Sequence, residues 1–131
     1  MKNLQNVIIV DDDPSNNLLC KTIIKRVYPD AEIKSFLKAE DGLVFIAENY
    51  SDAAAVNPSN IFLDINMPLM NGWEFLDEFE KFPDFIKTQF TIYMLSSSID
   101  DSDKERAAAN ELVTGFISKP LSREIISRLF G

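Results

Sequence analysis

The chain contains no histidine. This absence excludes Ser-His-Asp and Cys-His catalysis, zinc sites built on histidine, and any phosphohistidine carried by the chain itself. The one cysteine, Cys20, cannot form an internal disulfide. Because Cys20 lies among apolar residues such as Leu19 and Ile23, we predict a small buried side chain without chemistry of its own. Any reaction must therefore rest on carboxylates, hydroxyls and lysines.

Positive charge and long apolar runs are also scarce. The chain has 13 Lys+Arg against 21 Asp+Glu, a formal net charge of -8, which repels nucleic acid phosphates and anionic membrane surfaces. No apolar run approaches the roughly 20 residues that a membrane-spanning helix needs, and the first residues do not resemble a signal peptide. We expect a cytoplasmic protein that binds neither nucleic acid nor membrane directly.

What the sequence does contain fits one α/β domain over residues 1–131. Its 131 residues are 46% hydrophobic, which is enough for one core between layers of secondary structure. Hydrophobic runs alternate with amphipathic stretches, a pattern typical of βαβ units around a parallel sheet. The five strands are expected at residues 7–10, 32–36, 61–63, 90–95 and 113–118.

Apolar residues recur at helical spacing between these strands. The stripes predicted to face the sheet are Leu19-Ile23-Val27, Leu43-Ile46-Tyr50, Leu76-Phe79-Phe82 and Leu121-Ile125-Leu129. Asp13-Pro14 predicts a helix N-cap and first turn, Pro29 and Pro83 predict helix ends, and Asn110 suits a left-handed position after a helix. The fourth helix, near residues 102–111, has only three alanines to bury, so we predict that it is the most mobile.

Acidic residues follow two of the expected strands. Asp11 and Asp12 come after the first strand, and Asp64 comes after the third. Right-handed crossovers would place these two strands side by side, with their carboxyl ends at one edge of the sheet. Three carboxylates on strands ~4.8 Å apart would repel unless a cation lay among them, and an oxygen-only cluster suits Mg²⁺. Taken alone, the acidic triplet is equally a polar turn and Asp64 an ordinary loop carboxylate.

A hydroxyl and an ammonium are expected at the same edge. Ser96 follows the fourth strand and Lys119 follows the fifth. Each alone would be an ordinary loop serine or solvated lysine, but at successive strand ends they could serve a phosphoryl group on Asp64. Phosphoryl transfer places charge on three oxygens, which a metal, an ammonium and a hydroxyl can stabilise without an acid-base residue. The lack of histidine is therefore no obstacle.

Four segments together resemble the response-regulator receiver family. They are Val10-Asp11-Asp12, the stretch from Leu63-Asp64-Ile65-Asn66 to Asn71-Gly72, Leu95-Ser96-Ser97 and Lys119-Pro120-Leu121. They occur in the family's order and span nearly the whole chain. The resemblance implies a flavodoxin-like, doubly wound (βα)5 fold with a five-stranded parallel sheet of order 2-1-3-4-5 and helices on both faces.

The resemblance also implies a role for each site residue. Asp64 would be the phosphoacceptor, and Mg²⁺ would be held by Asp64, by Asp12 directly, by Asp11 largely through water, and by the backbone carbonyl of Asn66. Ser96 and Lys119 would bind phosphoryl oxygens. Asn66 and Ser98 would flank the attacking water, and the Lys119-Pro120 peptide would be cis.

A switch is part of what the resemblance implies. Ser96 would move toward the phosphoryl group and Phe116 would turn inward, changing the surface of the fourth helix, the last strand and the last helix. As a half-buried strand aromatic, Phe116 has an equally ordinary interpretation. The implied partners are a histidine kinase or histidine phosphotransfer protein and a downstream protein target, or a second histidine protein in a relay. We expect a monomer or a weak phosphorylation-dependent dimer, with no output domain.

Two other functions stay open at this stage. An aspartate-nucleophile phosphohydrolase would attack through Asp11 with Asp13 as general acid, and would turn over repeatedly. A pseudo-receiver scaffold would accept no phosphoryl group at all. A receiver, in contrast, is no enzyme beyond its own phosphorylation and slow autodephosphorylation, so its labelling would be stoichiometric and lost without Asp64.

Overall fold

The computed structural model describes residues 4–97 and 100–130. One parallel sheet runs through the molecule in the order β2-β1-β3-β4-β5, which confirms the expected topology. Its strands are β1 (Asn6–Val10), β2 (Glu32–Phe36), β3 (Ser59–Asp64), β4 (Phe90–Ser96) and β5 (Val113–Ser118). The strand order reverses between β1 and β3, and ligands of such sheets bind at the carboxyl ends beside that point.

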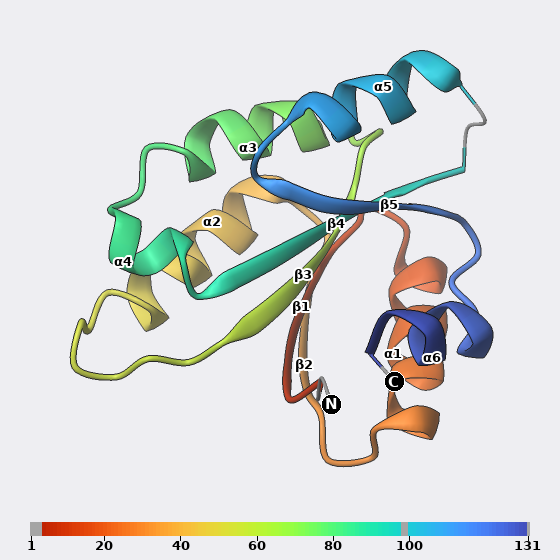
Figure 1. Cartoon of the computed structure of the whole chain (residues 1–131), viewed down its shortest axis with the longest axis horizontal. Helices are drawn as coiled ribbons and strands as arrows, with labels where there is room; N and C mark the ends of the chain where they lie inside the picture. The colour runs from red at the N-terminus through yellow and green to blue at the C-terminus, as the bar shows by residue number, and fades with distance from the viewer. Residues whose placement is uncertain (1–3, 98–99, 131) are drawn as a thin grey trace.

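Helices cover both faces of the sheet (Figure 1). They are α1 (Pro14–Val27), α2 (Ala39–Asn49), α3 (Gly72–Phe79), α4 (Asp84–Lys87), α5 (Asp101–Ala109) and α6 (Arg123–Phe130). One face carries α1 and α6, and the other carries α2, α3, α4 and α5. No helix within residues 4–97 and 100–130 combines the length and the apolar character needed to traverse a lipid bilayer.

The core beneath α1 and α6 is rich in aromatic contacts. The Phe62 ring stacks on Tyr93 with centroids 5.6 Å apart, and Phe130 meets Tyr93 edge to face at 5.5 Å. Cys20 is fully buried in this cluster, as predicted, and burial raises the pKa of its thiol to about 11. An inert thiol is what such a site produces.

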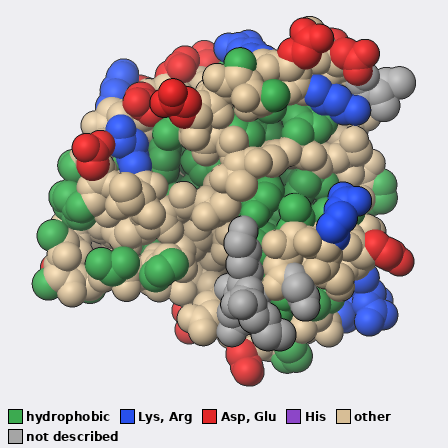
Figure 2. Space-filling model, viewed as in Figure 1, with side chains coloured by type: hydrophobic (Ala, Val, Ile, Leu, Met, Phe, Trp, Pro, Cys, Tyr) green, Lys and Arg blue, Asp and Glu red, His purple; other side chains and the backbone are tan. Residues whose placement is uncertain are grey.

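The core on the opposite face is unequally shared among its helices. From α3 come Phe75 and Phe79, both buried, whose rings stack with centroids 6.3 Å apart. From α5 the described side chains contribute one buried residue, Ala107. The helix α5 is also held by Arg106, whose guanidinium lies 4.4 Å from the centroid of the Trp73 ring. Figure 2 shows acidic side chains gathered over α3 and α5.

The two stripes predicted for α1 and α6 are confirmed in part, because Leu121 is buried and Ile23, Val27, Ile125 and Leu129 pack half-buried against the core. On α1 the buried residues are Cys20 and Ile24, whereas Leu19 is 41% exposed. On α6 they are Ile126 and Phe130. Both helices carry adjacent apolar residues, such as Ile23-Ile24 and Ile125-Ile126, so periodicity alone leaves the rotation of the helix about its axis undecided.

The residues at which the helices begin and end were predicted in part. The carboxylate of Asp13 accepts the N–H of Ser15 at 2.9 Å, which confirms the N-cap before Pro14. Pro29 and Pro83 follow the ends of α1 and α3, as predicted. Pro83 also precedes the additional single turn α4, because a proline at a helix start costs no hydrogen bond. Asn110 has φ -93°, and its side chain accepts the N–H of Leu112 instead of adopting the left-handed conformation.

Candidate functional site

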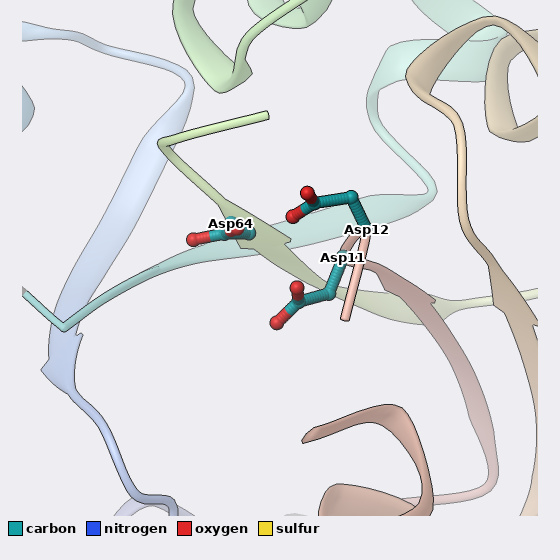
Figure 3. A group of neighbouring side chains, drawn as sticks. All are labelled: Asp11, Asp12 and Asp64. Atoms are coloured by element: carbon teal, nitrogen blue, oxygen red, sulfur yellow. The ribbon is translucent and has the colours of Figure 1, made fainter. Parts of the chain in front are cut away.

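Three carboxylates converge where β1 and β3 end (Figure 3). Asp11 and Asp12 directly follow β1, and Asp64 is the last residue of β3. Their nearest oxygen atoms all lie within 4.8 Å of one another. Asp11 and Asp64 are buried, whereas Asp12 is exposed, so the cluster opens to solvent on one side. The structure thus brings together the three acidic residues that the sequence singled out.

The Asp11 side chain is held by hydrogen bonds from its own neighbourhood. Its Oδ1 accepts the Asp13 N–H at 2.9 Å, and its Oδ2 accepts Asn16 Nδ2 at 2.6 Å. The Asp11 backbone carbonyl accepts Asn17 Nδ2 at 2.9 Å. Sequence reasoning missed Asn16 and Asn17. The available signal was the Asn-Asn pair in the first turn of α1, which follows the N-cap Asp13 after Pro14 and Ser15.

Asp64 lies in surroundings that disfavour its charge. Burial and the negative charge of Asp11 raise its pKa to about 6, although the Lys119 ammonium and the backbone N–H of Asn66 oppose the shift. The side chain is 5% exposed. A buried carboxylate beside a second carboxylate is an arrangement that a cation stabilises. The three acidic residues together carry more negative charge than one lysine neutralises.

Lys119 supplies the fixed positive charge of the cluster. Its Nζ lies 2.8 Å from Asp11 Oδ2 and 3.3 Å from Asp64 Oδ1. Burial alone would lower the pKa of this ammonium, but its hydrogen bond to Asp11 and the charges of Asp64 and Asp11 outweigh burial and raise it. Lys119 therefore stays protonated across the physiological pH range. The Lys119-Pro120 peptide is cis, as the resemblance implied.

Ser96 ends β4 beside Lys119. The backbone N–H of Lys119 donates to the Ser96 carbonyl at 2.8 Å, so β4 and β5 end together, and Ser96 is buried. Asn66 lies on the exposed loop after Asp64, and Ser98 lies outside the described residues. Phe116, on β5, is half-buried against the core beneath α3 and α5.

The start of α3 presses closely against the end of β3. The Gly72 N–H donates to the Ile65 carbonyl at 2.9 Å, and a Cβ at Gly72 would lie 2.6 Å from the Asp64 carbonyl oxygen. A side chain at this position would therefore displace the segment that carries Asp64. In the loop between them, Leu69 has φ 68° and is 85% exposed, a strained conformation for a residue with a bulky side chain.

The arrangement has the parts of an oxygen-ligated cation site with an anion-binding neighbour. Asp11, Asp12 and Asp64 offer hard carboxylate ligands, which suit Mg²⁺, and the exposed side leaves access for water. Lys119 stands beside Asp64 as a donor for a group attached to that carboxylate. Asp13 is not one of these three carboxylates, because its side chain caps α1 by accepting the Ser15 N–H.

Comparisons with known proteins agree with this geometry. The family model of the response regulator receiver domain matches residues 7–130. A two-component response regulator from Cytophaga hutchinsonii is 34% identical, with a TM-score of 0.86, over 98% of this chain and 95% of that one. A response regulator receiver protein from Dyadobacter fermentans is 26% identical, with a TM-score of 0.81, over 95% of this chain and 96% of that one.

The chemotaxis protein CheY4 of Vibrio cholerae shares the fold at lower identity. It is 22% identical, with a TM-score of 0.72, over 96% of this chain and 95% of that one. A comparison with curated proteins finds no match.

Proposed function

Because the chain belongs to the response regulator receiver family of two-component signalling, we propose that it is a switch phosphorylated on Asp64. The phosphoryl donor is a histidine kinase or a histidine phosphotransfer protein. The observation that carries the proposal is the position of Asp64, a buried carboxylate at the end of β3 with Lys119 Nζ 3.3 Å away and two further acidic residues in reach.

The transfer needs few groups from this chain. An oxygen of ionised Asp64 attacks the donor's phosphorus, the phosphorus–nitrogen bond of the phosphohistidine breaks, and its electron pair stays on the imidazole nitrogen. Lys119 stabilises the charge on the phosphoryl oxygens as a fixed donor, and we assign the same task to the Ser96 hydroxyl. With a pKa of about 6, Asp64 is mostly ionised at neutral pH and can act as nucleophile.

The carboxylates would hold the metal. Asp11, Asp12 and Asp64, with the backbone carbonyl of Asn66, are the proposed ligands of Mg²⁺, which when bound neutralises charge on the acceptor and the phosphoryl oxygens. The contacts of Asp11 from Asn16 and from the Asp13 N–H hold its carboxylate in place for this task.

The output surface is proposed at α5, β5 and α6. Phosphorylation draws in Ser96, and Phe116 follows by packing because it has no hydroxyl. Support comes from the position of α5, which follows the end of β4 and buries little. A downstream protein target would bind there, or a second histidine protein would take the group onward.

A phosphohydrolase that attacks through Asp11 is the weaker candidate. Both oxygens of Asp11 already accept hydrogen bonds, from the Asp13 N–H and from Asn16, and Oδ2 also pairs with Lys119. Asp13, the general acid in that mechanism, is occupied as the cap of α1. These contacts favour Asp64 as the nucleophile.

The test is phosphorylation by acetyl phosphate with Mg²⁺, followed by intact mass. Wild type should gain one phosphoryl group, and the gain should disappear with EDTA and in Asp64→Asn. Asp30→Asn, in an exposed loop, is the matched control and should label normally. Labelling that persists in Asp64→Asn but not in Asp11→Asn would favour the phosphohydrolase. No labelling with acetyl phosphate or any histidine kinase would leave an inert scaffold.

The output surface has a separate test. Beryllofluoride, which mimics the phosphoryl group, should change amide exchange in α5 and β5 of the wild type and leave Asp64→Asn unchanged. Equal exchange with and without beryllofluoride would contradict the proposed switch.

A further inference from the structure

An apolar groove runs between α2 and α3, on the face of the sheet away from α1 and α6. Its volume is about 420 Å³. Apolar residues of α2 and of the segments flanking α3 line it, and glutamates stand at its edges. The lining residues are Leu43, Val44, Ala47, Met70 and Phe82, with Glu40 and Glu78.

Part of the groove belongs to the edge of the core, because Leu43, Met70 and Phe82 are partly buried against it, whereas Val44 and Ala47 are exposed. The core-facing residues of α2 are Ile46 and its neighbours toward the sheet, and Ile46 is fully buried. Val44 points elsewhere, because it is 54% exposed. With Ala47 one turn later, it forms a second apolar stripe on the outer side of α2. Apolar surface gathered in a groove and rimmed by charge is typical of a protein-binding site.

The edges of the groove are negative. Two carboxylates line it, Glu40 of α2 and Glu78 of α3, and its lining contains no lysine or arginine. Lys81, beyond the end of α3, pairs with Glu78 at 2.6 Å. A partner in this groove would therefore meet apolar side chains flanked by carboxylates.

We propose that this groove binds an amphipathic helix of another protein, with an apolar stripe flanked by lysine or arginine. The helix α2 forms one wall, and Glu78 with the segments flanking α3 forms the other. The backbone groups of α2 are hydrogen-bonded within the helix, and the N–H groups of Met70 and Phe82 donate to the Pro68 and Phe79 carbonyls. These walls offer no edge to an extended peptide, whereas a helix brings its own backbone bonds satisfied and lays side chains into the groove. The eight residues of α3 span about 12 Å, which matches two to three turns of a bound helix.

A second copy of the chain is the less suitable occupant. Each copy has a net charge of -8 and would bring carboxylates against carboxylates. The groove is also distinct from the phosphorylation site, and its occupation requires no phosphoryl group. The inference therefore goes beyond the proposed switch.

The test uses a fluorescein-labelled amphipathic peptide of leucine and lysine, about 18 residues or five turns long. The control peptide has the same leucines but carries glutamate in place of each lysine. Fluorescence anisotropy measures the affinity of each for the wild type, for Val44→Lys and for Val56→Lys. Val56 is the matched control, a valine 71% exposed in the loop before β3.

The leucine-lysine peptide should bind wild type and Val56→Lys alike, and Val44→Lys at least about tenfold more weakly, a change of about 1.4 kcal/mol. The glutamate peptide should also bind the wild type at least about tenfold more weakly. Equal binding to the two lysine variants, or equal binding of the two peptides, would overturn the proposal. So would a wild-type dimer in sedimentation velocity that Val44→Lys abolishes, because the occupant would then be a second copy.

Two controls keep the result interpretable. If Val44→Lys fails to fold by circular dichroism, Ala47→Lys replaces it, because Ala47 is exposed on the same stripe. Acetyl phosphate labelling should be the same in Val44→Lys and wild type. Loss of peptide binding with normal labelling separates the groove from the switch, and peptide binding without any labelling would contradict the switch alone.

Discussion

The middle and the carboxyl end of β4 lie in opposite environments. In its middle, Tyr93 packs with Phe62 and Phe130 in a layer of aromatic rings closed by α6. At its carboxyl end, Ser96 borders a cluster of buried charges in which Asp11 and Asp64 share one lysine. Apolar burial stabilises the first region, whereas the second retains Asp64, a carboxylate whose charge is disfavoured. Stability and chemistry are therefore placed in different parts of the same strands.

The helices beside β5 repeat this contrast. The apolar stripe of α6 is buried through Ile126 and Phe130, so the helix is anchored in the core. The helix α5 follows the site and buries only Ala107 among its described side chains. The Arg106 guanidinium, which lies over the Trp73 ring, is a second contact that holds it. A weakly anchored helix next to the site can change position at low cost, while a firmly anchored one preserves the fold.

Of the changes that test this comparison, Phe130→Ala should have the largest effect. Loss of a buried aromatic ring that contacts Phe62 and Tyr93 should lower the free energy of unfolding by about 3–5 kcal/mol. Urea denaturation measures it, and Leu129→Ala, on the half-buried side of α6, is the control with a smaller loss. A change below about 1 kcal/mol would mean that α6 is not the anchor.

Asp64→Asn should change the free energy of unfolding in the opposite direction and stabilise the protein. Because the fold raises the pKa of Asp64 from 3.8 to about 6, its charge destabilises the protein as pH rises from about 4 to 6, and fully above that. Replacing it should raise stability at pH 7.5 by about 1–3 kcal/mol, and by almost nothing at pH 4. Urea denaturation without metal at both pH values is the measurement. A gain that does not depend on pH would point to packing instead.

Amide exchange sharpens the comparison between the two helices. We expect the amides of α5 to exchange at least about tenfold faster than those of α6, a difference of about 1.4 kcal/mol in opening free energy. The sequence already predicted this mobility from the few apolar residues of the helix. Equal protection in α5 and α6 would show that Ala107 and Arg106 suffice as anchors.

The smallest effect is expected from Arg106→Gln. Loss of the guanidinium over Trp73 should cost about 0.5–1 kcal/mol and speed exchange in α5. Trp73 is the single tryptophan, so its fluorescence reports the contact directly. Arg123→Gln, on α6, should leave the fluorescence unchanged. An unaltered spectrum in Arg106→Gln would mean that the contact is absent in solution.

The sequence predicted the sheet well because its strands are short apolar runs with clear ends. The two edge strands at 32–36 and 113–118 had the expected bounds. The rotation of α1 and α6 was predicted only roughly, because adjacent isoleucines gave two neighbouring stripes: the predicted Ile23 and Ile125 pack half-buried against the core, and Ile24 and Ile126 are fully buried. The turn α4 was missed because four residues are too few for a periodic signal, and Asn110 satisfied its polar groups by a side-chain hydrogen bond that composition does not reveal.

Of the site, the acidic cluster and Lys119 were predictable because parallel strands bring their carboxyl ends together. The contact of Asn16 with Asp11 was not, because it depends on the path of the chain from β1 into the first turn of α1. The repulsion expected among the carboxylates does raise the pKa of Asp64, but the size of the shift was beyond the sequence because burial is its largest cause. The roles of all these residues stay predictions, those of Asp64 and Lys119 as much as those of Ser96, Asn66 and Phe116.

The two ion pairs of Lys119 bear on the protein's biosynthesis. A site that relied on an outside metal to offset its buried carboxylates could be completed only after that metal arrived. Here the ammonium contacts both Asp11 and Asp64, so part of the compensation is encoded in the chain itself. A newly made molecule can therefore fold before any ion binds, and under the proposed function chelation should prevent phosphorylation without unfolding the protein.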